Sequence, residues 1–179
     1  KVPGTPEWIG AFSEYFNADE KTVYKLADQT SYEMGTLAEP LAVAVHTVNH
    51  AETRTGGLVI LGAGTIGQLI LAVARKRGYS PIIVTDTAAF NREFAVKHGA
   101  DAALDPVTEN IPEKVKEMTG GRGADLAIIA AGADNILDQA CECVHKCGEI
   151  GIVAMITNKI PFYCYSVVFS ELKIYGAMC

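Results

Sequence analysis

The stretch LVILGAGTIGQLI, residues 58–70, decides how the rest of the chain is interpreted. Its first four residues form a short apolar run, which is typical of a buried strand. Gly62, Gly64 and Gly67 follow, and apolar residues then recur at the spacing of one helical face as far as Val73. The stretch therefore predicts a strand, a tight glycine turn and a helix in direct succession.

The three glycines have the spacing G-x-G-x-x-G, which is typical of a turn that binds a dinucleotide. The first glycine permits the tight turn, the second lets a pyrophosphate approach the backbone, and the third lets helix and strand pack closely. The amides at the start of the helix can then face an anion, which the helix dipole also favours. Because the chain has 17 glycines, the motif depends on its strand-before, helix-after setting.

Asp86 lies nineteen residues beyond Gly67, at the end of the next expected strand. A carboxylate at this position accepts hydrogen bonds from the adenosine ribose and repels the extra phosphate of NADP. Strand, turn and acid together therefore predict an NAD site. Arg92 opposes this preference, since a nearby arginine can accommodate a 2′-phosphate, but we expect Asp86 to dominate. The alternative is a packing turn followed by an unrelated surface aspartate.

Beyond the turn, apolar runs alternate with helical patterns that carry their own end signals. The first helix ends in three basic residues and Gly78, the second ends at Gly99, and Asp134 is the expected N-cap of a later helix. This alternation predicts an α/β fold, a doubly wound parallel six-stranded sheet with helices on both faces, the NAD(P)-binding Rossmann fold. The expected strands lie in 58–61, 81–86, 101–105, 124–132, 149–156 and 171–179, and the expected helices in 65–78, 90–99, 111–120 and 135–148.

Residues 1–57 do not follow this alternation. GAFSEYF (10–16) and KTVYKLAD (21–28) have the composition of short strands, and residues 31–51 have a helical pattern that we expect to be interrupted at Pro40. The N-terminal third therefore resembles the end of a different domain.

The composition excludes several classes of protein. A net charge of −6 provides no positive field for a nucleic-acid backbone, and the longest apolar runs are far shorter than a membrane span. The chain starts at Lys1 without a signal-peptide pattern, and its five cysteines suggest no disulfide framework. We expect a cytoplasmic protein that interacts with neither nucleic acid nor membrane.

Several stretches in fixed order resemble the zinc-dependent medium-chain dehydrogenase/reductase family, most closely its polyol branch of sorbitol- and xylitol-type dehydrogenases. The resemblance implies an NAD-dependent oxidation of a secondary alcohol or polyol, in which zinc polarises the alcohol oxygen and hydride passes to the nicotinamide. The stretches are GAFSEYF, YKLAD, AEPLAVAVH, LVILGAGTIGQL, VTD, AVKHGADAALD, GRGADLAIIAAGA and CGEIGIVAM.

The resemblance also implies roles for individual residues. Residues of the glycine turn match the family's pyrophosphate site, and Asp86 matches its ribose acid. Three further positions match backbone sites beside the nicotinamide. The implied cofactor-binding residues are Gly62, Gly64, Thr65, Ile66, Gly67, Asp86, Asn91, Arg92, Ala131, Val153 and Ala177.

Two departures from the family pattern concern the adenine side and a loop. Family members often place an arginine five residues after the ribose acid, whereas this chain has Asn91 there and Arg92 next. Cys147 stands where a pair of glycines is usual, and we expect only a loop to differ.

Glu39 matches a carboxylate that polyol-type members place close to the catalytic zinc. The resemblance offers no other metal residue, because the family's Cys and Gly-His-Glu ligands lie upstream of the matching stretches. A catalytic zinc needs three protein ligands and an open position. We therefore expect a fragment with a catalytic-domain remnant at 1–37, a truncated NAD-binding domain at 38–179, and no catalysis without the rest of the enzyme.

The other histidine, cysteine and tyrosine patterns fit structural roles better than metal binding or catalysis. His46 and His50 are four residues apart but lack the intervening glutamate of a metalloprotease helix. Cys141 and Cys143 lie on opposite sides of the expected helix, so packing is the favoured role. No Tyr-x-x-x-Lys of a short-chain dehydrogenase is present.

Two alternative functions remain open at this point. One is a zinc-free, NADPH-dependent relative of the quinone oxidoreductases, against which Glu39 and Asp86 argue. The other is an NAD(H)-sensing regulatory module, which would share the glycine turn and the acid but needs a partner domain. The oligomeric state is also left open: SELKIYGAMC (170–179) could form the edge through which family members pair, which would give a homo-oligomer.

Overall fold

The computed structural model describes residues 10–178 of the chain. The chain divides into two compact units, Lys1–Thr36 and Leu37–Cys179, and each is described by itself. No helix in the described part of the chain has the length and apolar character needed to cross a membrane.

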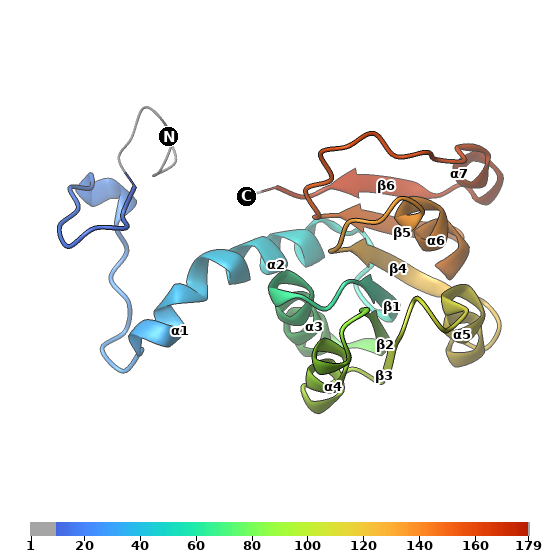
Figure 1. Cartoon of the computed structure of the whole chain (residues 1–179), viewed down its shortest axis with the longest axis horizontal. Coiled ribbons are helices and arrows are strands. Elements are labelled where there is room, and N and C mark those ends of the chain that lie inside the picture. The colour runs from blue at the N-terminus through green and yellow to red at the C-terminus, as the bar shows by residue number, and fades with distance from the viewer. Residues whose placement is uncertain (1–9, 179) are drawn as a thin grey trace. The chain divides into compact units, whose positions relative to one another are not determined.

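The second unit is built on a six-stranded parallel sheet in the order β3-β2-β1-β4-β5-β6 (Figure 1). Every neighbouring pair is parallel, and the order reverses direction between β1 and β4. This arrangement confirms the predicted doubly wound α/β fold. The strands are β1 Gly56–Leu61, β2 Tyr79–Thr85, β3 Ala102–Leu104, β4 Ala124–Ile129, β5 Val144–Ile152 and β6 Lys173–Gly176.

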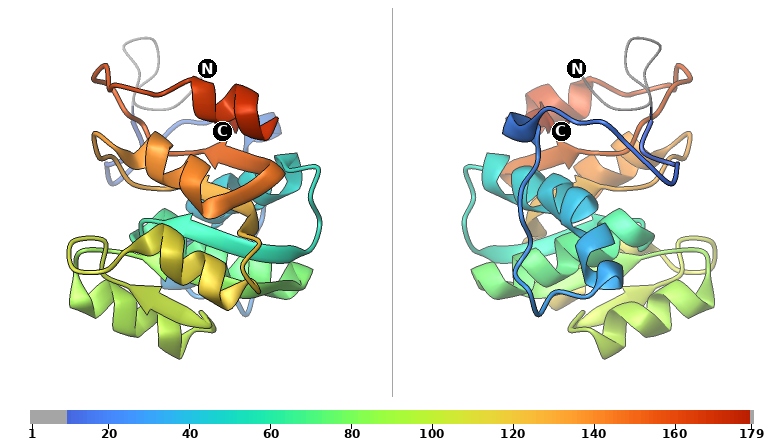
Figure 2. Two further views of the ribbon diagram at one scale, coloured as in Figure 1. Left: turned by 90° about the vertical axis from the view of Figure 1, so that its right-hand side faces the viewer. Right: turned by 90° about the vertical axis from the view of Figure 1, so that its left-hand side faces the viewer.

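Helices cover both faces of the sheet (Figure 2). Because successive side chains of a strand point to opposite faces, Leu58 and Ile60 enter one core cluster while Val59 and Leu61 enter the other. The first cluster includes residues of α2, α3 and α4, and the second includes residues of α5 and α6. The helices of this unit are α2 Ala38–His50, α3 Thr65–Arg77, α4 Ala89–Lys97, α5 Ile111–Met118, α6 Ile136–Cys143 and α7 Tyr165–Ser170.

The ends of α3 are set by glycine at both sides. Gly64 is the N-cap, and Gly78 is a left-handed C-cap with φ 90° whose amide donates to the carbonyls of Ala74 and Arg75. The predicted helix is therefore confirmed together with its cap. Three basic residues occupy its last turn, where the helix dipole favours positive charge.

The boundary between α6 and β5 differs from the prediction. The N-cap is Asn135 rather than Asp134, and it makes no side-chain capping hydrogen bond. The helix also ends at Cys143 instead of continuing to residue 148, because Val144 already pairs with Ala124 at the start of β4. The register then shifts before the regular pairing resumes, so β5 starts five residues earlier than predicted.

The two short strands predicted near the N-terminus are wrong. Within residues 10–36 the structure has a 3₁₀ helix at Glu20–Thr22 and the helix α1 Tyr32–Thr36, and neither GAFSEYF nor KTVYKLAD forms a strand. A strand needs a hydrogen-bonded neighbour, and no segment of this range supplies one to another.

The predicted interruption at Pro40 is also wrong. The helical stretch is divided at Leu37, and Pro40 is the third residue of α2. Proline is tolerated there because the first amides of a helix have no intrahelical acceptor.

Candidate dinucleotide-binding site

A crevice opens at the carboxyl ends of β1 and β4, where the strand order reverses. In open α/β sheets this is the place where ligands bind. The hollow has a volume of about 330 Å³, and its walls include Gly62, Asp86 and Ala131. The structure thus brings together the first glycine of the turn, the expected ribose acid and one of the positions expected beside the nicotinamide.

Gly62 occupies a position where any side chain would be strained. Its φ is 110°, and a Cβ built there would lie 2.6 Å from the Cβ of Ala131. Its amide donates to the carbonyl of Thr85 at 2.9 Å, which ties the turn to the end of β2. Glycine at 62 therefore lets β1, β2 and β4 converge on one crevice.

Gly67 and Gly64 have different roles. A Cβ on Gly67 would lie 1.9 Å from the carbonyl oxygen of Gly62, so this glycine permits α3 to touch the turn. A Cβ on Gly64 would have no atom of the described residues within 4 Å. Thr65 is exposed and Ile66 packs its side chain against the first core cluster. The start of α3 is thus open at Gly64, where a ligand could approach the amides.

Asp86 follows β2 and is held by backbone amides. Its Oδ2 accepts from the amide of Ala63 at 2.9 Å, and its Oδ1 accepts from the amide of Ala88 at 2.8 Å. A carboxylate offers about four lone-pair sites, so two of them remain for further donors. The carboxylate is half-exposed and lines the crevice, so it can accept from a pair of hydroxyl groups.

Arg92 contacts the loop that carries Asp86 and does not face the crevice. Its Nη1 donates to the carbonyls of Asp86 at 2.7 Å and Thr87 at 2.9 Å, and its Nη2 lies 3.2 Å from Oδ2 of Asp105. The guanidinium therefore braces the loop that carries Asp86 through its backbone carbonyls.

Asn91 is linked to the glycine turn through a residue that sequence analysis did not select. Gln68 donates from Nε2 to the carbonyl of Asn91 at 2.9 Å and to that of Ala63 at 3.1 Å. Among the described residues, its buried Oε1 has no hydrogen-bond partner. Asn91 lines a second hollow of about 310 Å³ that also touches Gly64.

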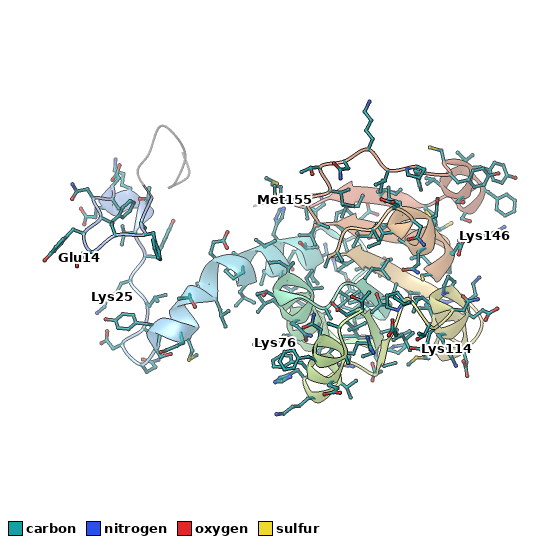
Figure 3. All side chains as sticks on the ribbon, viewed as in Figure 1. Glu14, Lys25, Lys76, Lys114, Lys146 and Met155 are labelled. Atoms are coloured by element: carbon teal, nitrogen blue, oxygen red, sulfur yellow. The ribbon has the colours of Figure 1, made fainter. Side chains whose placement is uncertain are left out.

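Val153 and Ala177 lie together at the carboxyl ends of β5 and β6. Their amides donate to the carbonyls of Ile129 and Ile152 at 3.0 and 2.9 Å. Both line a third hollow of about 540 Å³, next to Met155, which Figure 3 labels. Val153, Ala177 and Ala131 all lie at the carboxyl ends of the strands. Val153 and Ala177 line one hollow, and Ala131 lines another.

Glu39 is exposed on the first turn of α2. Within residues 10–178 no three or more His, Cys, Asp or Glu side chains gather closely enough to hold a metal ion. The rings of His46 and His50 contact each other edge-on at 5.4 Å, and His50 also stacks on Tyr175 at 5.2 Å. The histidine rings are thus aromatic packing partners in this structure.

The burial of the cysteines of α6 disfavours their thiolate forms. Burial raises the pKa of the Cys141 thiol to about 11 and that of Cys143 to about 12. A thiol with such a pKa has almost no thiolate near neutral pH, and the thiolate is the nucleophile and the metal ligand.

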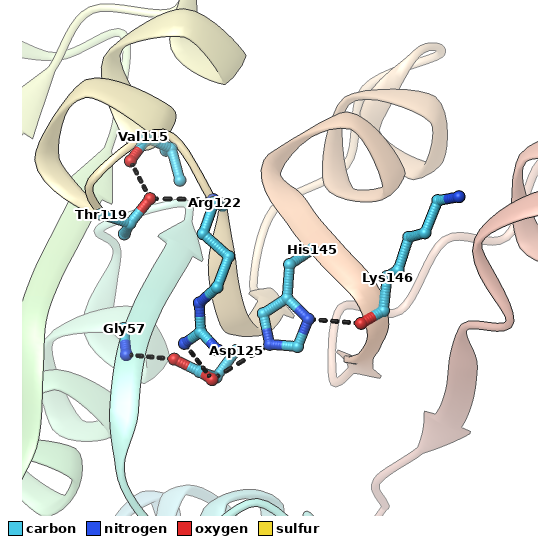
Figure 4. Close-up of polar contacts among 8 residues, drawn as sticks. Gly57, Val115, Thr119, Arg122, Asp125, His145 and Lys146 are labelled. Carbon is cyan, nitrogen blue, oxygen red and sulfur yellow. Dashed lines mark hydrogen bonds and ion pairs between the residues drawn. The ribbon is translucent and has the colours of Figure 1, made fainter.

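The amino ends of the central strands, opposite the crevice, carry a polar cluster centred on Asp125 (Figure 4). Its carboxylate accepts from the amide of Gly57 at 2.7 Å, from Arg122 at 2.7 Å and contacts Nε2 of His145 at 3.0 Å. Gly57, Asp125 and His145 belong to β1, β4 and β5 near their amino ends. The cluster therefore joins strands and lies away from the crevice.

Sequence analysis missed several residues of the crevice. The loop that follows β3 contributes Pro106 and Val107 to the crevice wall, and Asp105, just before them, lies outside that wall. A usable signal existed, because residues that follow parallel strands meet at one edge of the sheet. Other missed wall residues are Thr85, Thr87, Gly132, Ala133, Asn135, Ile136 and Gln139.

Comparison with known proteins gives matches over nearly the whole chain. Residues 65–179 match the family model described as zinc-binding dehydrogenase. The chain is 33% identical over 168 residues to an L-threonine 3-dehydrogenase of Pyrococcus horikoshii, covering 93% of this chain and 48% of that protein. It is 32% identical over 174 residues to a sorbitol dehydrogenase of Bacillus subtilis, covering 96% of this chain and 49% of that protein.

A solved structure gives the same result. The crystal structure of 2R,3R-butanediol dehydrogenase from Bacillus subtilis superposes with a TM-score of 0.87 at 30% identity. The alignment covers 94% of this chain and 49% of that one. The chain thus spans about half the length of the relatives that it matches.

Proposed function

The chain belongs to the zinc-binding dehydrogenase family, and on that premise we propose that residues 38–179 are the NAD-binding domain of an alcohol or polyol dehydrogenase. The whole enzyme would transfer hydride from a secondary alcohol to NAD. Sorbitol and threonine, which appear in the relatives' names, both carry a secondary alcohol, and this supports a small alcohol or polyol as substrate.

One observation carries the proposal. The open backbone at Gly64 and the half-exposed carboxylate of Asp86 lie at the same end of the sheet, joined by the hydrogen bond from Ala63 to Asp86. A helix start that accepts an anion beside a carboxylate that accepts hydroxyl groups matches a pyrophosphate followed by a ribose. We assign these two groups to NAD, which supplies the hydride acceptor when it is bound.

The other proposed cofactor residues fit around these two. Gly62 and Gly67 keep the turn narrow, while the amides of Thr65 and Ile66 open the helix toward the pyrophosphate. Further residues would line the path on either side of the turn. Asn91, which lines the hollow beside Gly64, is proposed on the adenosine side, and Arg92 is proposed to act there through the backbone of Asp86 and Thr87. Ala131, Val153 and Ala177 are proposed on the nicotinamide side.

Zinc does not fit the described residues by themselves. Glu39 is a single exposed carboxylate, and a catalytic zinc needs three protein ligands. Glu39 stays a proposed neighbour of the metal in the whole enzyme. The contribution that we assign to this chain is to bind and orient the dinucleotide.

The two alternative functions have less support. The relatives are named as dehydrogenases of threonine and sorbitol, which favours the alcohol dehydrogenase over a quinone reductase or an NAD(H) sensor. A cytoplasmic location and pairing through the edge strand β6 stay predictions.

Titration with NADH tests the proposal directly. We expect the chain to bind NADH, seen as a change in nicotinamide fluorescence, and the Gly64→Val variant to bind at least about tenfold more weakly, because a side chain there would occupy the pyrophosphate's approach. The variant should still fold, since its side chain has open space. Glu117→Ala, on the exposed surface of α5, serves as the control and should bind normally. Absence of NADH binding by the unmodified chain, or equal binding by Gly64→Val, would refute the proposal.

A further inference from the structure

The guanidinium of Arg92 contacts three groups in this structure. Besides the two carbonyls of Asp86 and Thr87, its guanidinium pairs with the carboxylate of Asp105 at 3.2 Å. Only about a fifth of each side chain in the pair is exposed, so solvent screens the pair less than it would a fully exposed one. The guanidinium is therefore fixed in one position.

That position is on the outer side of the loop. Asp86 and Thr87 line the crevice, whereas Arg92 lines a different hollow, of about 470 Å³, together with Lys97 and Ala103. The guanidinium lies against the main chain of Asp86, with Nη1 2.7 Å from its carbonyl oxygen. It touches the backbone of Asp86 but does not present its donors beside the carboxylate.

This placement bears on the choice between NAD and NADP. NADP differs from NAD by a phosphate on the adenosine ribose, and a nearby arginine is the usual partner of that phosphate. An arginine presents five donors in a planar fork, which matches a phosphate well. A guanidinium that could turn toward the ribose would therefore offset the repulsion between Asp86 and the phosphate.

Asp105 is itself positioned by the turn that follows β3. Its Oδ1 accepts from the amide of Val107 at 3.0 Å, and its own amide donates to Oε2 of Glu109 at 2.7 Å. The second carboxylate oxygen is thus aimed at Arg92 by local geometry. An asparagine at 105 could keep the bond to Val107 while losing the negative charge that holds Arg92.

We propose that Asp105 is a specificity-determining residue, which favours NAD over NADP by holding Arg92 away from the ribose. It acts through Arg92 and is a positioning residue. This inference rests on the proposed NAD site at Asp86, and it adds a second determinant to the carboxylate itself.

The test compares dissociation constants for NADH and NADPH, measured by fluorescence titration of the unmodified chain and its variants. Asp105→Asn should bind NADPH about tenfold more tightly, the size of one new charge-assisted contact. Its affinity for NADH should stay within about twofold, since Asp105 does not line the crevice and NAD has no 2′-phosphate for Arg92 to bind. The double variant R92Q/D105N should lose the gain, because no guanidinium remains.

Asp101→Asn is the matched control. Asp101 pairs with Arg75 at 2.6 Å, and its replacement changes the net charge by the same amount without touching the loop that carries Asp86. We expect it to leave the ratio of the two dissociation constants unchanged. Circular dichroism of each variant checks that the fold is retained.

The outcomes separate this inference from the function on which it rests. If the unmodified chain binds neither nucleotide, both are refuted. If it binds NADH but D105N leaves the NADH-to-NADPH ratio unchanged, only the role of Asp105 is refuted. The same holds if the gain survives in R92Q/D105N or is matched by Asp101→Asn.

Discussion

Each glycine of the turn at 62–67 has its own physical requirement. Gly62 combines a positive φ with a contact that leaves no room for a Cβ, whereas Gly64 has an ordinary φ of −68° and open space around it. The first glycine is therefore required by the fold, and the second is available to a ligand. The motif predicts this division of roles, and the geometry adds the contacts behind it: Ala131 against Gly62, and open space at Gly64.

A matched pair of alanine substitutions tests this separation. Gly62→Ala should lower the free energy of unfolding by about 2 kcal/mol or more, since left-handed backbone costs an L-residue roughly 1–2 kcal/mol and the contact with Ala131 adds to it. Gly64→Ala should lower it by about 1 kcal/mol at most, because it replaces an N-cap glycine that has open space around it. Urea denaturation measures both values, and equal effects would contradict the assignment.

At the scale of elements, two buried or half-buried carboxylates join segments far apart in sequence. Glu149 in β5 is buried and accepts from the amides of Glu52 and Thr53 at 2.9 and 3.1 Å, which attaches the connection after α2 to the sheet. Asp125 joins the starts of β1, β4 and β5 (Figure 4). Single carboxylates thus fix segments on both sides of the position between β1 and β4 where the strand order reverses.

Asp125 makes the free energy of unfolding depend on pH in the acid range. Burial acts to raise the pKa of this carboxyl, but the hydrogen bonds from Gly57 and His145 and the Arg122 cation lower it below its usual value. The ionised form is therefore favoured by folding, and its contribution is present above the unfolded pKa of about 3.9 and is lost as the pH falls through the folded pKa.

The Asp125→Asn variant should consequently be less stable than the unmodified chain at pH 7, and the difference should shrink as the pH falls below about 4. Urea denaturation at a series of pH values measures the two curves. A difference that stays constant, or grows, toward low pH would show that the charge of Asp125 does not contribute.

At the scale of the whole molecule, the crevice is the meeting point of both halves of the sheet. Its walls include residues that follow β1, β2, β3 and β4, so a ligand there contacts segments from Leu61 to Gln139. A ligand that binds only the folded state stabilises it by mass action. NADH should therefore stabilise the sheet as a unit and not only the turn.

We expect NADH at one hundred times its dissociation constant to raise the free energy of unfolding by about 2.7 kcal/mol. Thermal denaturation should accordingly shift upward with NADH concentration. The same concentrations should leave the Gly64→Val variant nearly unshifted, because its binding site is obstructed. An equal shift in both proteins would indicate binding elsewhere.

The strand, turn and helix from Gly56 to Gly78 follow from the sequence by itself, because apolar periodicity and glycine conformation act over a few residues. The same local signals predict the alternation of elements and hence the parallel sheet and its crevice. They also place Asp86 correctly, since it follows directly from the end of β2.

Only the tertiary structure decided the features that depend on partners distant in sequence. The end of α6 at Cys143 is set by the pairing of Val144 with Ala124, and the direction of Arg92 is set by Asp105. Local pattern could not predict either, because helix propensity and the presence of an arginine say nothing about which neighbour the fold supplies. The sequence by itself determined the glycine turn at 62–67, and long-range contacts determined which side chains face the crevice.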